Sequence, residues 1–256
     1  LIGDQGWFQI YTPDRVDIRQ DMMRRAKEAG FHTLIITVDV PVDSRRERQR
    51  RADLTIPPKV TPKMLLSMML HPAWTLGTLR EGIPSLKFCE DYADDDDFNS
   101  LAHAGHIIRG QPGWDTIEDM RGEWDGPILV KGVQKPENAV RLMGMGIDGI
   151  WVSNHTGRQF DGGPACLDAL PAIREACPDA PIVFDSGIQG GLDILRALAL
   201  GADFVMLGRA WHYAVGALGE KGPEHLIHIL KDDMRSNMGQ MGARNLSDLR
   251  ERLVQG

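Results

Sequence analysis

The chain has 256 residues, of which 42% are hydrophobic and 25% are charged. That length suffices for one large globular domain or two small ones, and the composition excludes disordered, collagen-like and coiled-coil chains. Because Lys and Arg number 29 against 36 Asp and Glu, the net charge of −7 argues against a nucleic-acid partner. Cys89, Cys166 and Cys177 are an odd number without paired spacing, so we expect neither disulfides nor a metal site, and a reducing, cytoplasmic setting.

Short apolar runs recur along the chain and predict a parallel α/β fold. Six of them occupy residues 7–11, 33–37, 127–131, 149–153, 181–185 and 203–207. Continuous apolar runs of this length are typical of strands that are buried on both faces of a parallel sheet. Helical spacing of apolar residues separates them, at 16–28, 136–146, 167–176 and 192–200, and recurs at 224–238. The pattern is that of repeated βα units.

Polar side chains at the carboxyl ends of these runs favour a (β/α)8 TIM barrel over a doubly wound sheet. They are Gln9 and Tyr11, Thr37 and Asp39, Lys131, Ser153 with Asn154 and His155, Asp185, and Arg209. In a barrel all strand ends meet on the face that carries the active site. Alternatively, each polar residue could only cap the helix that follows it. Capping would explain a single such position, but it is a poor explanation for six consecutive strand ends. No G-x-G-x-x-G sequence follows a run, which disfavours a dinucleotide-binding fold.

Residues 43–126 interrupt the pattern and are predicted to form a long insertion within a single domain that spans 1–256. Residues 43–51 are strongly basic, and residues 63–70 are rich in Met and Leu. Two interpretations of the Met/Leu stretch remain open: an amphipathic element on a membrane surface, or a helix packed on the outside of the barrel. We favour the second, because such stripes are usually core. No stretch reaches the ~18 apolar residues of a membrane-spanning helix.

The most concentrated set of reactive side chains lies on the loop after the fourth run. A single histidine is more often structural, but His155 shares this loop with Arg158, whose guanidinium fork suits a carboxylate. We therefore predict a carboxylate-bearing substrate held by Arg158 and Arg46, with His155 as the base. Asp39 can accept a hydrogen bond from the imidazole, and Tyr11 can donate one to the substrate.

A glycine-rich turn at 185–191 follows the fifth run, and Gly208 and Arg209 end the sixth. In barrels, the loops after the last two strands often bind phosphate through backbone N–H groups and a helix N-terminus. We therefore expect the phosphate of a cofactor here, with Lys131 facing the cofactor ring.

Seven segments resemble the FMN-dependent α-hydroxy acid dehydrogenase/oxidase family, which includes L-lactate dehydrogenase, glycolate oxidase and mandelate dehydrogenase. They are Trp-Phe-Gln-Ile-Tyr at 7–11, Thr-Val-Asp-Val-Pro at 37–41 with Arg-Arg-Glu at 45–47, and residues 128–133, 152–161, 185–187, 197–202 and 207–209. They occur in the family's order from residue 7 to the C-terminus. The Ser-Asn-His…Arg-Gln block within 152–161 is highly specific.

The resemblance implies an FMN-linked TIM barrel that oxidises an L-2-hydroxy acid, with L-lactate as first choice, to the 2-oxo acid. It implies His155 as base, Asp39 as its partner, and Tyr11, Arg46 and Arg158 as substrate ligands. The residues matched to FMN contacts are Gln9, Thr37, Lys131, Ser153, Asp185, Ser186, Gly187, Ile188, Gln189, Gly208 and Arg209.

The resemblance also implies partners. A quinone or cytochrome would accept the electrons, at the inner face of the cell membrane, and the protein would be a homotetramer. Two alternatives stay open: an oxidase of the same family that uses O2, and a non-catalytic fragment without flavin.

Three departures from the family pattern qualify these expectations. Thr156 stands where the family has glycine, and its branched side chain narrows the backbone options. Gln189 stands where the family commonly has arginine, which leaves more of the phosphate's charge to Arg209. The first two barrel strands have no counterpart, and the chain begins without Met. We therefore expect an N-terminally truncated barrel of six strands.

Overall fold

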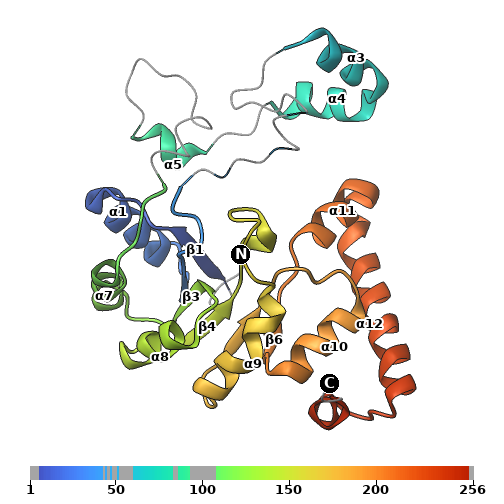
Figure 1. Cartoon of the computed structure of the whole chain (residues 1–256). Helices are drawn as coiled ribbons and strands as arrows, with labels where there is room; N and C mark the ends of the chain where they lie inside the picture. Colours follow the sequence, from blue (N-terminus) through green and yellow to red (C-terminus); the bar gives the residue numbers. More distant parts are fainter. Residues whose placement is uncertain are drawn as a thin grey trace.

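The computed structural model describes residues 6–42, 44, 47, 51, 60–82, 86–92 and 108–253, which form one parallel sheet with helices around it (Figure 1). Six strands pair in the order β1-β2-β3-β4-β5-β6. They are β1 (Trp7–Tyr11), β2 (Thr33–Thr37), β3 (Ile128–Val133), β4 (Gly149–Val152), β5 (Ile182–Phe184) and β6 (Phe204–Val205). Each strand lies beside the next in sequence, as in a (β/α) barrel. The expected barrel segment of six strands is thus confirmed.

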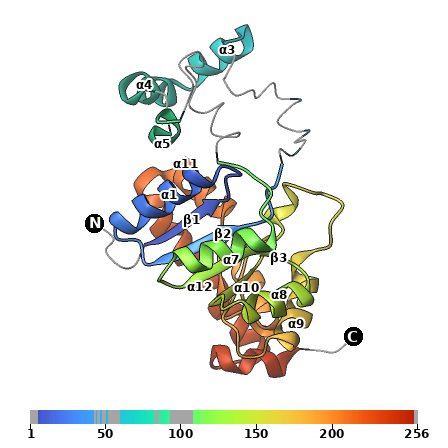
Figure 2. The same ribbon diagram turned by 90° about the vertical axis from the view of Figure 1, so that its left-hand side faces the viewer.

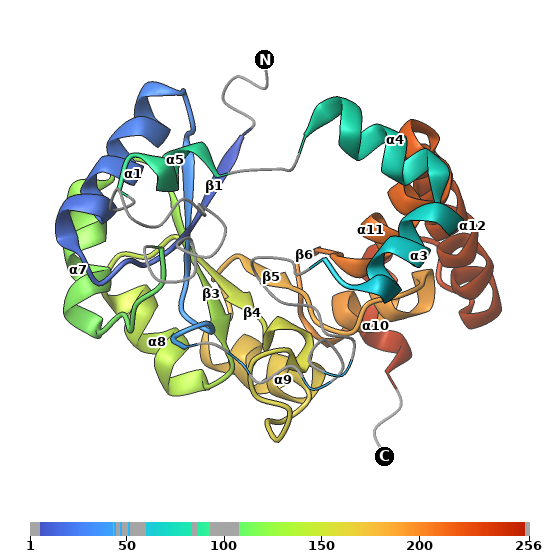
Figure 3. The same cartoon turned by 90° about the horizontal axis from the view of Figure 1, so that it is seen from above.

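Helices cross over between the strands and lie outside them, as the view from above shows (Figure 3). The helices of the barrel are α1 (Val16–Glu28), α7 (Trp114–Glu123), α8 (Pro136–Gly144), α9 (Cys166–Ala176), α10 (Gly191–Leu200), α11 (Arg209–Leu218) and α12 (Gly222–Met241). Within residues 108–253 the chain also forms the 3-10 turns η2 (His155–Gly157), η3 (Gly219–Lys221) and η4 (Leu246–Arg252). The five expected helices are confirmed within three residues at each end. The sixth strand is shorter than expected, and α11, which begins at Arg209, was not expected as a helix.

The strand pleat divides the buried side chains into two sets. One set packs under the helices and includes Leu34, Ile36, Ile128, Val130, Ile150, Val152, Ile182 and Phe184. The other faces the inside of the barrel and consists of Ile35, Leu129, Trp151 and Val183. Because side chains alternate along a strand, the residues two positions further on face the same way. Those residues are Thr37, Lys131, Ser153 and Asp185, so the pleat itself places polar groups at the inner mouth of the barrel.

In the described part of the insertion between residues 60 and 92, the chain forms the short helices α3 (Pro62–Leu70), α4 (Pro72–Glu81) and α5 (Lys87–Glu90). Figures 1 and 2 both place α3 and α4 beyond the carboxyl ends of the strands, away from the helices around the sheet. Neither α3 nor α4 contains a buried residue. Among the described residues, none buries a side chain of α3, which contradicts the favoured interpretation of 63–70 as a helix packed on the outside of the barrel. None of the helices in the described ranges is long and apolar enough to cross a membrane.

Candidate active site

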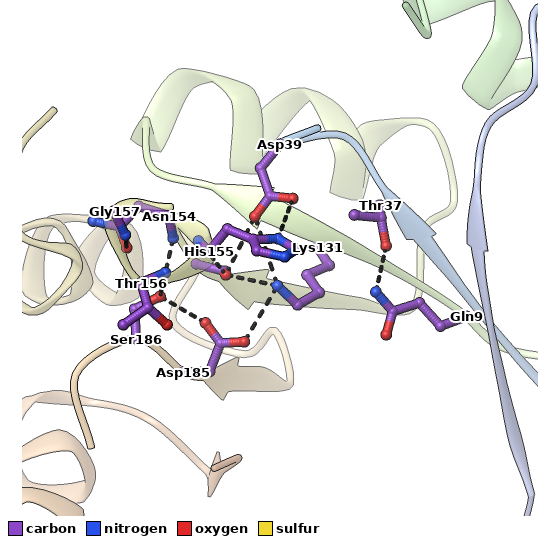
Figure 4. A network of polar contacts seen from close by, with 11 residues as sticks. Gln9, Thr37, Asp39, Lys131, Asn154, His155, Thr156, Gly157, Asp185 and Ser186 are labelled. Atoms are coloured by element: carbon purple, nitrogen blue, oxygen red, sulfur yellow. Dashed lines mark hydrogen bonds and ion pairs between the residues drawn. The ribbon is translucent and has the colours of Figure 1, made fainter. Parts of the chain in front are cut away.

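Lys131 lies at the centre of a buried polar network at the mouth of the barrel (Figure 4). Its Nζ atom donates to Ser153 Oγ at 2.8 Å and lies 3.2 Å from Asp185 Oδ2 and 3.6 Å from Asp39 Oδ2. The ammonium also lies 5.5 Å from the centre of the Trp151 ring. Lys131 is only 6% exposed, and a charge buried to this extent requires such partners. The network holds one cation between two carboxylates supplied by different strand ends.

His155 is held by the same network. Its Nδ1 atom lies 3.2 Å from Asp39 Oδ1, while the other Asp39 oxygen faces Lys131 and accepts a 3.4 Å hydrogen bond from Ser153 Oγ. Donation from Nδ1 to Asp39 leaves Nε2 as the ring atom that can accept a proton. The expected partnership of Asp39 and His155 is present in the geometry.

A cavity of about 620 Å³ opens beside this network, a volume within the range of small-molecule sites. Its lining brings together most of the predicted site residues: Gln9, Tyr11, Lys131, His155, Arg158, Asp185, Ser186, Gly187, Ile188, Gly208 and Arg209. Thr37 and Ser153 lie outside the lining but contact it, because Thr37 Oγ1 accepts a 2.8 Å hydrogen bond from Gln9 Nε2 and Ser153 accepts from Lys131. Arg46 falls outside the described residues.

The cavity is also lined by residues that the sequence analysis did not place in the site. His212 and Tyr213 line it from the first turn and a half of α11, and Thr156 lines it from η2. The spacing of His212 and Tyr213 from Arg209, three and four residues, places them on one face of a helix. That spacing is visible in the sequence. Because a strand and not a helix was predicted to end at Arg209, the sequence analysis did not place these two residues at the site.

The predicted phosphate site lies beside two helix N-termini, and the surroundings of these two helix ends differ. The first turn of α10 already binds carboxylates: Asp193 Oδ2 accepts from the backbone N–H of Gln189 (3.1 Å) and Gly190 (3.3 Å), and Asp233 Oδ2 accepts from Gly191 (2.5 Å) and Leu192 (3.2 Å). Two negative charges at this helix end oppose a phosphate there. The N-terminus of α11, at Gly208 and Arg209, lies at the cavity instead. Gln189 is exposed and does not line the cavity.

Cys166 lies close behind the network but takes no nucleophilic part in it. Burial raises the pKa of its thiol to about 12. A thiol with that pKa is protonated near neutral pH, and the thiolate is the reactive form.

The chain is similar to known proteins in both sequence and fold. The family model described as FMN-dependent dehydrogenase matches residues 2–256. An L-lactate dehydrogenase of Acinetobacter baylyi is 38% identical over 257 residues, which cover 96% of this chain and 65% of the relative. An L-lactate dehydrogenase of Pseudomonas aeruginosa (strain LESB58) is 37% identical over 255 residues, 95% of this chain and 65% of the relative.

Two solved structures are similar in fold. The monotopic membrane protein (S)-mandelate dehydrogenase superposes with a TM-score of 0.89 at 33% identity and covers 97% of this chain and 66% of its own. The Pediococcus acidilactici lactate oxidase superposes with a TM-score of 0.74 at 28% identity and covers 96% of this chain and 59% of its own. The chain thus spans about 65% of the length of the curated relatives it matches.

The family description names FMN, which confirms the cofactor expected for this family from the sequence. A match over almost the whole chain, together with the six consecutive parallel strands and the site at their carboxyl ends, leads to one conclusion. The chain belongs to the FMN-dependent dehydrogenase family.

Proposed function

We propose that the protein oxidises an L-2-hydroxy acid, with L-lactate as first choice, to the 2-oxo acid with FMN as cofactor. The observation that carries this proposal is the His155–Asp39 pair, whose imidazole lines one cavity together with Arg158 and Lys131. A proton acceptor beside a guanidinium suits a substrate that has both a hydroxyl and a carboxylate group.

The residues of the cavity fit FMN. The amide of Gln9 and the ammonium of Lys131 are hydrogen-bond donors for a polar ring edge, while Arg209 and the N-terminus of α11 offer positive charge for a phosphate. Buried Lys131 would favour negative charge on a bound ring. Bound FMN would supply the two-electron acceptor that none of the side chains provides.

The protein's own residues have separate tasks in this proposal. Nε2 of His155 accepts the proton, and Asp39 stabilises the resulting imidazolium while holding its orientation. Arg158 and Arg46 bind the carboxylate, and Tyr11 donates a hydrogen bond to a substrate oxygen. Whether the hydrogen on Cα leaves as a proton or a hydride, His155 takes one proton.

The test uses the whole chain loaded with FMN in the absence of oxygen. L-Lactate should bleach the flavin absorption, D-lactate should not, and the His155→Gln variant should bind FMN without being bleached. Retention of bleaching within about tenfold of the original rate in His155→Gln would remove His155 from the role of base. Failure of the chain to bind FMN would favour the non-catalytic fragment.

The electron acceptor is tested in the same sample. We propose a quinone or cytochrome, so a soluble quinone analogue should reoxidise the bleached flavin much faster than air does. Rapid reoxidation by air with peroxide formation would favour the oxygen-using oxidase instead.

We further propose that α3 and α4 make peripheral contact with a membrane, on its cytoplasmic side. Leu65, Leu66, Met69, Leu70, Trp74, Leu76 and Leu79 are all exposed on these helices. Exposed apolar side chains concentrated on two consecutive helices are typical of an interaction site. The similarity to a monotopic membrane protein supports a bilayer as the partner.

Sedimentation with vesicles of mixed anionic and neutral lipid tests this contact. The original chain should pellet with the vesicles, and a variant with Leu66→Ser and Met69→Ser should stay in solution. Equal sedimentation of both would argue against the contact. Analytical ultracentrifugation of the lipid-free protein tests the expected tetramer.

A further inference from the structure

The loop that carries His155 follows a left-handed path. The φ angles are 54° at His155, 60° at Thr156 and 67° at Gly157. Positive φ is uncommon for residues other than glycine and is a genuine outlier for a β-branched residue. Thr156 is the β-branched one, at the position where the family pattern has glycine. Contacts with other residues must therefore stabilise the left-handed conformation of Thr156.

Hydrogen bonds from four consecutive backbone N–H groups hold the loop. His155 N donates to Ser153 Oγ at 3.1 Å, and Gly157 N donates to Asn154 Oδ1 at 3.1 Å, both acceptors lying within the same loop. The N–H groups of Asn154 and Thr156 both donate to Ser186 Oγ, at 3.2 and 3.1 Å. Ser186 follows β5, so this one hydroxyl ties the loop to a different strand end.

The Ser186 hydroxyl is itself oriented by the network. It donates to Asp185 Oδ1 at 2.8 Å, and the other oxygen of Asp185 lies 3.2 Å from Lys131 Nζ. A serine hydroxyl has one proton to donate and two lone pairs to accept with. Both capacities are used here: the hydroxyl donates to Asp185 and accepts from two N–H groups of the loop (Figure 4).

We propose that Ser186 is a positioning residue for His155: its hydroxyl keeps Thr156 in the left-handed conformation and thereby keeps the imidazole against Asp39. The importance of this positioning for turnover rests on the proposed role of His155 as base. The conformational part does not, because it concerns contacts within the chain alone. Without the Ser186 hydroxyl, the loop should leave the left-handed conformation more often, because the branched side chain of Thr156 disfavours that conformation.

The experiment is amide hydrogen exchange on the whole chain without FMN. Ser186→Ala removes the acceptor of Asn154 and Thr156, so faster exchange there would be trivial. The informative amides are those of His155 and Gly157, whose acceptors remain in place. We expect their exchange to speed up at least tenfold in Ser186→Ala, while the amides of β4 and α8 are unchanged.

Rescue separates positioning from general weakening. Glycine adopts positive φ without cost, so Thr156→Gly in the Ser186→Ala background should reduce the effect on the His155 and Gly157 amides to less than about threefold. The ¹⁵N signals of the imidazole report independently on the bond to Asp39, and the Nδ1–H form should decline in Ser186→Ala and recover in the double variant.

Two further variants keep the outcome clear. Ser236→Ala, at an exposed position on α12, is the matched control and should change nothing. Ser186→Gly removes the hydroxyl while relieving the serine's own φ of 86°, so it reports on the loop even if the alanine variant folds poorly. Unchanged His155 and Gly157 amides in both Ser186 variants, or equal losses with and without the Thr156→Gly change, would overturn the proposal. Failure to oxidise L-lactate with these amide results intact would affect only the proposed function.

Discussion

Asp39 and His155 are separated by 116 residues in sequence, yet Asp39 Oδ1 lies 3.2 Å from the Nδ1 atom of the imidazole. The second oxygen of the same carboxylate lies 3.6 Å from Lys131 Nζ. One side chain therefore connects the proposed proton acceptor with the cation beside the proposed cofactor site. A change at Asp39 should accordingly affect proton transfer more than cofactor retention, since Lys131 keeps Asp185 and Ser153 as partners.

Replacement of Asp39 by Asn tests this division. The amide keeps the shape of the side chain but cannot neutralise an imidazolium, so the rate of flavin reduction by L-lactate should fall by about 10²-fold or more. The dissociation constant of FMN should change by less than about threefold. Stopped-flow reduction and flavin titration measure the two effects, with exposed Asp179→Asn as control. Equal losses in both quantities would contradict the separation.

Arg158→Lys tests the carboxylate site. An ammonium cannot reproduce two parallel hydrogen bonds to a carboxylate, so KM for L-lactate should rise by about 10- to 100-fold, the equivalent of one or two charged hydrogen bonds. The limiting rate should fall much less. Steady-state kinetics with Arg250→Lys, an exposed change on η4, as control would distinguish this from a general effect. A fall in kcat with KM unchanged would place Arg158 outside substrate binding.

Gly191→Ala and Gly239→Ala should have opposite effects on stability. A Cβ atom at Gly191 would lie 2.5 Å from the backbone nitrogen of Met234, so packing of α10 on α12 must shift and unfolding should become easier by about 1–3 kcal/mol. A Cβ at Gly239, inside α12, meets nothing within 4 Å. Alanine there should stabilise by about 0.5–1 kcal/mol through helix propensity. Urea unfolding measures the free energy of unfolding of both variants. If both alanines stabilised the protein, close packing at Gly191 would not determine the effect there.

Tyr92 of the insertion donates a hydrogen bond to Asp21 of α1, and the stability that this bond contributes should depend on pH. The hydrogen bond from Tyr92, together with Arg24 and Arg25, holds the pKa of Asp21 below its ordinary value. A lowered folded-state pKa contributes stability that is present above the unfolded pKa, about 3.9, and is lost as pH falls through the folded value. Tyr92→Phe should therefore destabilise the chain at neutral pH, and its difference from the original chain should shrink in acid. Urea unfolding at several pH values tests this, and a pH-independent difference would assign the effect to packing.

The strands and the main site residues could be predicted because one physical feature determines both. A strand in a parallel sheet is apolar until its carboxyl end, where it leaves the core, so the first polar residues mark the mouth of the barrel. Thr37, Lys131, Ser153 and Asp185 follow this rule. The same rule failed at the sixth run: β6 pairs over two residues, and the chain turns into α11 directly after.

Other features depend on contacts that no local pattern contains. Asp233 reaches the N-terminus of α10 across 42 residues, and the glycine-rich turn before α10 gives no sign that a carboxylate occupies this helix end. The departure at Thr156 was visible in sequence, but its conformation depends on Ser186, 30 residues away. The exposure of α3 could not be predicted from its composition either. Apolar residues in a helix predict that one face is covered, but not whether the protein core, a partner or a membrane covers it.

The alternation of side chains from Ile128 to Lys131 in β3 also has a consequence for the maturation of the protein. In the β2–β3 pairing, Thr37 lies opposite Lys131, and Leu129 opposite Ile35. A slip of β3 by one residue would turn Lys131 toward the helices and bring Val130 to the inner face. Such a molecule would be compact and have the same strand content, yet its cation would be on the wrong side of the sheet. Secondary-structure spectra would not detect this misassembly, so the fraction of a preparation able to bind flavin is the sounder measure of correct folding.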